Sequence, residues 1–276
     1  MIDVSRLFRP EAPLVLIGCG RMAGALLARW RSCGLDRAAV RVVDPAGAPE
    51  GIAGVSCVAE LPDRAAGLLV LAVKPQSLAA VAPAIRQQWP EPVPLVSILA
   101  GTPLAALERQ LGPRPLIRAM PNIPAQVGAG LTAFIANSSG QRHSDAVRAL
   151  FASAGAVLPL QDEAAMDVVT AVSGSGPAYL FHVAEALAAA ARTAGLDAAS
   201  AALLARQTVV GSARLLEQDE RTFQALRAEV TSPGGTTAAG LAVLMDEDRL
   251  ENLMTETVAA AAARSRALGQ EGAGGT

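Results

Sequence analysis

The sequence is poor in aromatic residues, lysine and histidine. Only 3% of its 276 residues are aromatic although 51% are hydrophobic, so the core must be built from Ala, Leu and Val. Such a core favours closely packed helices and buried parallel strands. Lys74 is the only lysine, and His143 and His182 are the only histidines. A lysine-based mechanism would have to use Lys74, and two isolated histidines argue against a histidine metal cluster.

The sequence also lacks the cysteine spacing of a zinc site or a disulfide framework. Cys19, Cys33 and Cys57 are odd in number, which suits a reducing compartment. The net charge of −2 gives no electrostatic reason to expect nucleic acid or an anionic membrane as partner. No apolar run has the length of a membrane span or the flanks of a signal peptide. We therefore expect a cytoplasmic protein without a bound metal.

The first half of the chain alternates strands with helices, which predicts a mostly parallel sheet with crossover helices. Leu14–Ile17 is a continuous apolar run, typical of a strand buried on both faces. In the turn that follows, Gly18 makes the bend, Gly20 lets the backbone approach a pyrophosphate, and Ala23 allows close helix–strand packing. The pattern predicts a dinucleotide-binding turn; the alternative is a plain tight turn.

Two further positions could face the same cofactor. Asp44 closes the strand Val40–Val43, where an acidic side chain would bind both ribose hydroxyls and repel a 2′-phosphate, which favours NAD(H). Asp44 could equally serve only to start the turn with Pro45. Lys74 follows the apolar run Gly67–Val73, at the carboxyl end of a strand beside the glycine turn. It could meet a phosphate or ribose, or be an ordinary surface lysine.

Strand signals stop after about Pro159 and long helical runs replace them. This change predicts a dinucleotide-binding domain over residues 1–159 and a helical domain over residues 160–276. The helices are apolar over more than one face. A single small domain cannot bury all of these apolar faces within itself. We therefore expect an obligate oligomer assembled through this half.

Two glycine-rich segments of the second half each lead into a helix. In Ala171–Tyr179, Ser173 and Ser175 can cap free N–H groups and Pro177 suits a first helical turn. In Thr231–Thr237, two glycines precede two threonines at a helix start. Free N–H groups and the positive end of the helix dipole predict a site for a carboxylate at each. For the first segment alone, a helix–helix corner is an equal alternative.

These two segments, with Gly18–Ala23, Ala72–Pro75 and Met120–Asn122, resemble the pyrroline-5-carboxylate reductase family. The resemblance runs from about Leu14 to Gly269. It implies an α/β Rossmann-type N-terminal domain plus an all-α C-terminal dimerisation domain, in a homodimer or a ring of five dimers. The implied activity, the last step of proline biosynthesis, is hydride transfer from NADPH or NADH to the C=N bond of (S)-1-pyrroline-5-carboxylate, giving L-proline.

The resemblance also implies roles for individual residues. The substrate carboxylate would sit on backbone N–H groups of the second glycine-rich segment, and Thr237 is the candidate catalytic hydrogen-bond donor. No catalytic histidine or lysine is expected, since a protonated cyclic imine is itself a good hydride acceptor. The expected substrate-binding residues are Glu163, Ser173, Ser175, Gly176, Glu229, Gly235, Thr236 and Thr237. The expected cofactor-binding residues are Gly18, Cys19, Gly20, Arg21, Met22, Ala23, Asp44, Ala72, Val73, Lys74, Pro75, Ile98, Leu99, Ala100 and Asn122.

One departure from the family and two rival functions remain. NADPH-using members carry small polar or basic residues after the second strand, whereas this chain has Asp44-Pro45, which favours NADH. A 3-hydroxyacid dehydrogenase of similar architecture would need a lysine in the second domain, and none follows Lys74. The second rival is a dinucleotide-binding sensor that keeps the fold but catalyses no reaction. Only the two glycine-rich segments expected to bind the substrate argue against it.

Overall fold

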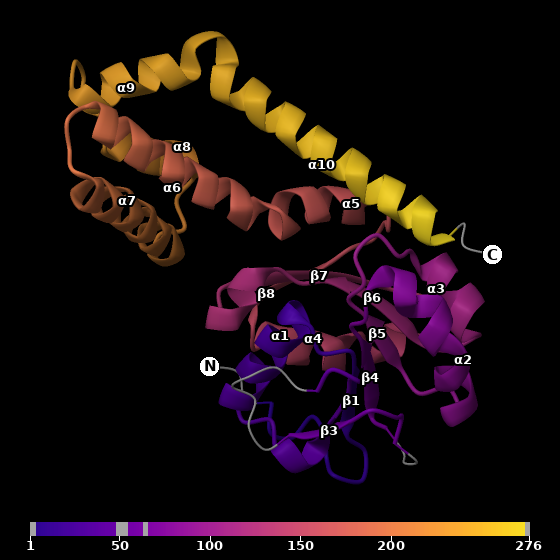
Figure 1. Cartoon of the computed structure of the whole chain (residues 1–276). Helices are drawn as coiled ribbons and strands as arrows, with labels where there is room; N and C mark the ends of the chain where they lie inside the picture. Colours follow the sequence, from indigo (N-terminus) through magenta and orange to yellow (C-terminus); the bar gives the residue numbers. More distant parts are fainter. Residues whose placement is uncertain (1–3, 48–54, 63–65, 274–276) are drawn as a thin grey trace. The chain divides into compact units, whose positions relative to one another are not determined.

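The computed structural model describes residues 4–47, 55–62 and 66–273, which form two compact units (Figure 1). The first unit contains the residues up to Ser175 and those from Ala261 onward. The second contains Gly176–Ala260. The last described strand ends at Pro159, where the sequence predicts the change from strands to helices. The first unit nevertheless continues past this strand to Ser175.

The first unit is organised around an eight-stranded sheet of order β3-β2-β1-β4-β5-β6-β7-β8. All neighbouring strands pair in parallel except β6 and β7, which are antiparallel, so the prediction of a mostly parallel sheet is confirmed. The strands are β1 (Leu14–Ile17), β2 (Val40–Val43), β3 (Ser56–Val58), β4 (Leu68–Leu71), β5 (Leu95–Ser97), β6 (Leu116–Met120), β7 (Gly130–Ala136) and β8 (Gly155–Pro159).

Helices cover both faces of this sheet because the central strands carry apolar side chains on both sides. One core joins alternate residues of β1 and β2 to the helices α1 and α4. In it the rings of Trp30 and Phe151 pack edge to face with their centroids 5.7 Å apart. The other core joins the opposite faces of β1 and β4 to α2 and α3. These helices are α1 (Arg21–Ser32), α2 (Leu78–Gln88), α3 (Leu104–Leu111) and α4 (Ser144–Ala152).

The order β2-β1-β4 creates the switch point of a Rossmann-type sheet. The chain leaves β1 toward β2 on one side and returns to β4 on the other, so the turns after β1 and β4 are neighbours. Ligands of such sheets bind outside the carboxyl ends of the strands at this point. Because β5 and β6 continue in parallel, the segments after Ser97 and Met120 lie along the same edge.

The second unit is helical, as predicted, and leaves many apolar side chains exposed. Leu180 and Phe181 are 59% and 65% exposed, and Phe223 is 80% exposed. The last helical run breaks at Asp246–Asp248, where Glu247 has φ 48°. No helix among the described residues is long and apolar enough to cross a membrane. The helices are α6 (Gly176–Thr193), α7 (Ala198–Gln218), α8 (Phe223–Glu229), α9 (Thr236–Met245) and α10 (Arg249–Ala273).

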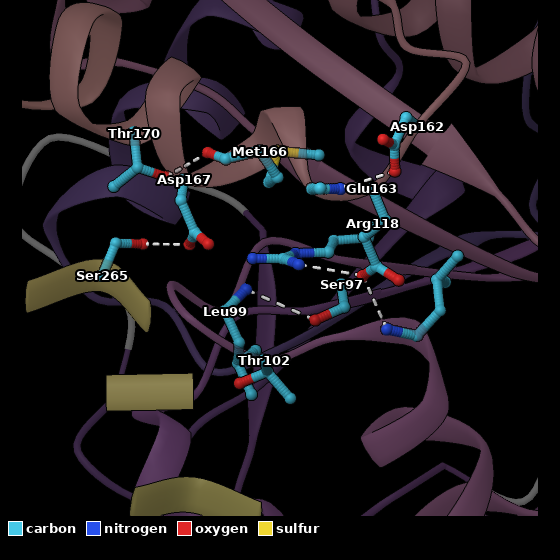
Figure 2. Close-up of polar contacts among 12 residues, drawn as sticks. Ser97, Leu99, Thr102, Arg118, Asp162, Glu163, Met166, Asp167, Thr170 and Ser265 are labelled. Carbon is cyan, nitrogen blue, oxygen red and sulfur yellow. Dashed lines mark hydrogen bonds and ion pairs between the residues drawn. The ribbon is translucent and has the colours of Figure 1, made fainter. Parts of the chain in front are cut away.

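The end of α10 packs within the first unit. The Ser265 hydroxyl donates a hydrogen bond to the Asp167 carboxylate at 2.7 Å, and Asp167 lies on the short helix α5 (Ala165–Val169) (Figure 2). Gly101, in the turn after β5, lies against Leu268 and Gly269, and a Cβ at this position would come within 3.2 Å of the Leu268 Cβ. The chain thus returns to the first unit after forming the second.

Candidate functional site

A pocket of about 820 Å³ lies at the switch point of the sheet, within the first unit. Seven of the predicted cofactor-binding residues line it: Gly18, Cys19, Gly20, Asp44, Ala72, Val73 and Lys74. The remaining lining residues come from β1, β2, the segment after β3 and α2: Ile17, Val43, Pro45, Ala46, Ala59, Glu60, Leu61, Ala80, Val81, Ala84, Gln87 and Gln88. A pocket of this size and place suits a dinucleotide.

The two glycines of the turn after β1 are required for different reasons. Gly18 has φ 86°, and a Cβ there would come within 2.8 Å of backbone atoms of Ala72 and Val73. Only glycine therefore lets the turn lie against the end of β4. Gly20 precedes α1 with φ −69°, and a Cβ added to it would meet no atom within 4 Å. Its missing side chain leaves open the space where a pyrophosphate would approach the amides of α1.

Asp44 fastens two backbone segments beside this pocket. One carboxylate oxygen accepts a hydrogen bond from the Cys19 N–H at 2.7 Å, and the other accepts one from the Ala46 N–H at 2.9 Å. Asp44 therefore does form the turn with Pro45, and it also lines the pocket. Glu60 is the second acidic side chain of the pocket and Lys74 is the only basic one among its described lining residues.

The Cys19 thiol lies in the same pocket but is not a candidate nucleophile. Burial, reinforced by the nearby Asp44 and Cys57, raises the pKa of the Cys19 thiol from 9.0 to about 11. A thiol with such a pKa is neutral near pH 7 and a poor nucleophile. All three cysteines are free, and the described residues contain no group of three His, Cys, Asp or Glu side chains that could hold a metal ion.

The other predicted cofactor residues do not line this pocket. Arg21, Met22 and Ala23 form the first turn of α1, and Ala23 packs in the core at 2% exposure. The turn after β5 is fastened by the Ile98 N–H, which donates to the Leu71 carbonyl at 3.0 Å. The cofactor roles of all these residues stay predictions. The set outside the pocket is Arg21, Met22, Ala23, Pro75, Ile98, Leu99, Ala100 and Asn122.

Asn122, which follows β6, connects the start of β7 with a helical turn of the first unit. Its amide nitrogen donates to the Ser173 carbonyl at 3.2 Å and lies 3.0 Å from the Ser173 hydroxyl, and its amide oxygen accepts from the Leu131 N–H at 2.8 Å. Ser173 belongs to a π-helical turn, Thr170–Gly174, that directly precedes α6. The sequence predicts a helical run over Glu163–Val172 and a fresh helix start at Pro177. The first run is helical and extends to Gly174, and the Ser175 N–H donates to the Thr170 carbonyl.

Glu163 lies in a partly buried polar cluster of the first unit (Figure 2). One oxygen of its carboxylate accepts hydrogen bonds from the Arg118 guanidinium and from the Leu104 N–H, both at 2.8 Å. The Arg118 side chain is only 7% exposed, so Glu163 compensates an otherwise buried charge and caps the start of α3. Sequence reasoning missed this contact, because nothing local marks Arg118 as its partner. A substrate role for Glu163 stays a prediction.

The predicted carboxylate site of the second unit has the expected local structure. Gly235 precedes α9, which begins at Thr236, so the N–H groups of the first helical turn point away from the helix. Gly234 has φ 69°, a conformation that favours glycine. Glu229 ends α8 and pairs with Arg221, which also binds Asp219. That Gly235, Thr236, Thr237 and Glu229 bind a substrate stays a prediction.

Comparisons with known proteins identify the family of this chain. Residues 163–268 match the family model described as pyrroline-5-carboxylate reductase dimerisation, and residues 13–101 match that of NADP oxidoreductase, coenzyme F420-dependent. A pyrroline-5-carboxylate reductase of Pseudomonas aeruginosa is 36% identical over 266 residues, which is 94% of this chain and 97% of the relative. One of Synechocystis is 43% identical over 205 residues, covering 74% and 76% of the two chains.

Solved structures give the same result over nearly the whole chain. A pyrroline-5-carboxylate reductase from Coxiella burnetii superposes with a TM-score of 0.85 at 31% identity, covering 94% of this chain and 98% of the other. A pyrroline carboxylate reductase from Plasmodium falciparum with NADP bound superposes with a TM-score of 0.81 at 27% identity, covering 94% and 99%. With its Rossmann-type unit and helical dimerisation unit, this chain belongs to the pyrroline-5-carboxylate reductase family.

Proposed function

We propose that this chain reduces the C=N bond of (S)-1-pyrroline-5-carboxylate with NAD(P)H and so forms L-proline, the last step of proline biosynthesis. The observation that carries the proposal is the pocket at the switch point, where Gly18 and Gly20 leave the backbone bare beside α1. Such a turn fits the pyrophosphate of a dinucleotide. The helical unit adds the segment before Thr237 that suits a small carboxylate.

The reaction depends more on aligning the coenzyme with the imine carbon than on a strong acid or base. NAD(P)H, when bound, supplies the hydride. The N–H groups of Thr236 and Thr237 would hold the substrate carboxylate at the positive end of α9. The Thr237 hydroxyl would donate a hydrogen bond to the lone pair that forms on the ring nitrogen as the hydride reaches the neighbouring carbon. Holding the imine carbon at the correct distance and angle can then supply much of the rate acceleration.

For the choice of coenzyme we propose that NADH is accepted at least as well as is expected for the family. Asp44 lines the pocket after β2 and Glu60 adds a second negative charge, while Lys74 is the only basic residue in the described lining. A 2′-phosphate carries about two negative charges near neutral pH and would be repelled by Asp44, whereas two ribose hydroxyls can donate to it.

For the assembly we propose an obligate homodimer formed through the second unit. The family match to a dimerisation domain supports homo-oligomerisation. The apolar side chains left exposed on α6, α7 and α9, among them Phe181, Leu203 and Val243, supply the surface. Light scattering after size-exclusion chromatography distinguishes a dimer from a ring of five dimers. The cytoplasmic location is also a proposal, which fractionation of the source cells tests.

The deciding experiment follows the loss of reduced coenzyme with the purified full-length chain. Pyrroline-5-carboxylate and cyclic imines of other ring sizes are offered with NADH and with NADPH, and the product is identified by mass spectrometry. We expect turnover with the five-membered ring and formation of proline. Tight binding of the coenzyme without turnover of any imine would favour the dinucleotide sensor and overturn the proposal.

A further inference from the structure

The side chain of Asn122 uses its whole amide to join three segments at the carboxyl edge of the sheet. Asn122 follows β6, whose end lies on the same edge as the ends of β1, β4 and β5. Its amide oxygen accepts the Leu131 N–H, and its amide nitrogen reaches both the carbonyl and the hydroxyl oxygens of Ser173. The residue is 8% exposed, so these partners are not readily exchanged for water.

The π-helical turn that receives these hydrogen bonds is held from a second side. A Cβ at Gly174 would come within 2.9 Å of the Met120 Cε, so the side chain of the last residue of β6 lies directly against the turn. Single π-helical turns are rare and occur often at functional sites. Here the turn contains Ser173 and Gly174 of the glycine-rich segment Ala171–Tyr179, called the serine–glycine segment below, and is followed by Ser175 and the start of α6.

We propose that Asn122 is a positioning residue for the substrate and not a ligand of the dinucleotide. By fixing the Ser173 backbone and hydroxyl, it sets the path of the serine–glycine segment that is expected to face the substrate. The proposal rests on the reductase activity proposed above. It also explains the residue type, since an aliphatic side chain offers neither group and a carboxylate cannot donate to the Ser173 carbonyl.

Steady-state kinetics and coenzyme titration of the variant Asn122→Ala distinguish a residue that positions the substrate from one that binds the coenzyme. Wild-type enzyme must first turn over pyrroline-5-carboxylate; if it does not, the proposed function has failed and not this inference. With an active wild type, we expect the variant to raise KM for the imine roughly tenfold or more. The Kd for reduced coenzyme, from its fluorescence in the absence of imine, should change by less than about twofold.

Two further variants test the contact from its other side. Gly174→Ala adds a Cβ against the flexible end of the Met120 side chain and leaves Asn122 intact, so it should fold and raise KM for the imine in the same way. Ser173→Ala removes one of the two acceptors, and its effect on KM should not add to that of Asn122→Ala. If Asn122→Ala does not fold, the KM for the imine and the Kd for coenzyme are measured in Gly174→Ala instead.

Three results would overturn the proposal. A Kd for coenzyme that rises as much as the KM for the imine would make Asn122 a cofactor ligand. A lower melting temperature with unchanged KM and kcat, in Asn122→Ala or in Gly174→Ala, would reduce the contact to a structural one. Strict additivity of Asn122→Ala and Ser173→Ala would mean that the two side chains act independently.

Discussion

The N–H of Cys19 donates a hydrogen bond of 2.7 Å to the carboxylate of Asp44, so the end of β2 holds the glycine turn that follows β1. The second carboxylate oxygen caps the turn at Ala46. Asp44 therefore has the predicted turn role and also lines the pocket, while its predicted binding to the coenzyme ribose stays a prediction. Its negative charge lies where the coenzyme ribose is expected.

Removing that charge should change the coenzyme preference. In Asp44→Ser we expect KM for NADPH to fall and KM for NADH to rise, by about tenfold in their ratio, because one repulsion and one pair of hydrogen bonds are lost. Steady-state kinetics with both coenzymes gives the ratio.

Two comparisons control this experiment. Asp36→Ser removes an exposed carboxylate that accepts a hydrogen bond from the Ala38 N–H and lies outside the pocket, so it should leave the ratio unchanged. Glu60→Gln should move the ratio in the direction of Asp44→Ser by a smaller amount. A strong preference of the wild type for NADPH would contradict the proposed role of Asp44.

Alanine substitutions of the two glycines in the turn after β1 should affect different properties of the protein. Gly18→Ala combines φ 86° with a contact of 2.8 Å to backbone atoms of Ala72, so we expect it to lower the free energy of unfolding by roughly 2 kcal/mol or more. Gly20→Ala meets no atom within 4 Å and should melt near the wild-type temperature. It should instead weaken coenzyme binding about tenfold, since its methyl group enters the pyrophosphate position.

Thermal melts and coenzyme titrations of both variants check this contrast. The reverse pattern, a stable Gly18→Ala that binds coenzyme normally or an unstable Gly20→Ala, would mean that the turn is not shaped for a pyrophosphate.

Thr237→Ala should lower kcat/KM for the imine by roughly tenfold or more, or about 1.4 kcal/mol of transition-state stabilisation, with the fold intact. The reason is the loss of a hydrogen-bond donor at the ring nitrogen. Thr193→Ala is the matched control, because the Thr193 hydroxyl is exposed and donates to the Ala189 carbonyl of its own helix. A fully active Thr237→Ala enzyme would remove this hydroxyl from the mechanism.

The Cys19 thiol should resist alkylation near neutral pH. Burial raises its pKa to about 11, so the thiolate is scarce well below that pH. Because the folded-state pKa exceeds the ordinary value of 9.0, the contribution of Cys19 to stability is present below pH 9 and is lost as the pH rises toward 11. Iodoacetamide followed by peptide mass spectrometry should modify the partly exposed Cys57 first. Rapid modification of Cys19 near pH 7 would contradict its burial.

A charge on the apolar surface of the second unit should break the assembly. Phe181 is 65% exposed on α6, and Phe181→Asp should give a monomer with little activity. Arg37→Glu, on the exposed surface of the first unit, should remain a dimer. Light scattering gives the mass of each variant, and a monomeric wild type with full activity would contradict an obligate dimer.

Local patterns in the sequence were sufficient for the Rossmann-type unit. Leu14–Ile17 is a strand with no residue added or lost, and Gly18 and Gly20 line the pocket as the turn pattern predicts. These features could be predicted because each depends on a few neighbouring residues: an apolar run, a backbone angle, a helix start. The helical second half could be predicted equally well, since long apolar helical runs replace the strands there.

Contacts between distant residues could not be predicted in this way. Arg118 pairs with Glu163 across 45 residues, and Asn122 with Ser173 across 51. The sequence singles out Glu163, Asn122 and Ser173 as candidate site residues, but nothing local shows which residue each one contacts, because only the folded sheet brings the pairs together. The π-helical turn was missed for a related reason, since glycine and serine before a proline indicate a loop unless a tertiary contact holds them helical.

The most direct measurement uses reduced coenzyme carrying deuterium at the transferable position of the nicotinamide C4. The purified chain is incubated with pyrroline-5-carboxylate and this coenzyme, and the product is examined by mass spectrometry and proton NMR. The expected result is L-proline with one deuterium on the ring carbon that was double-bonded to nitrogen. Proline without deuterium, or coenzyme consumed without proline, would contradict hydride transfer to the C=N bond.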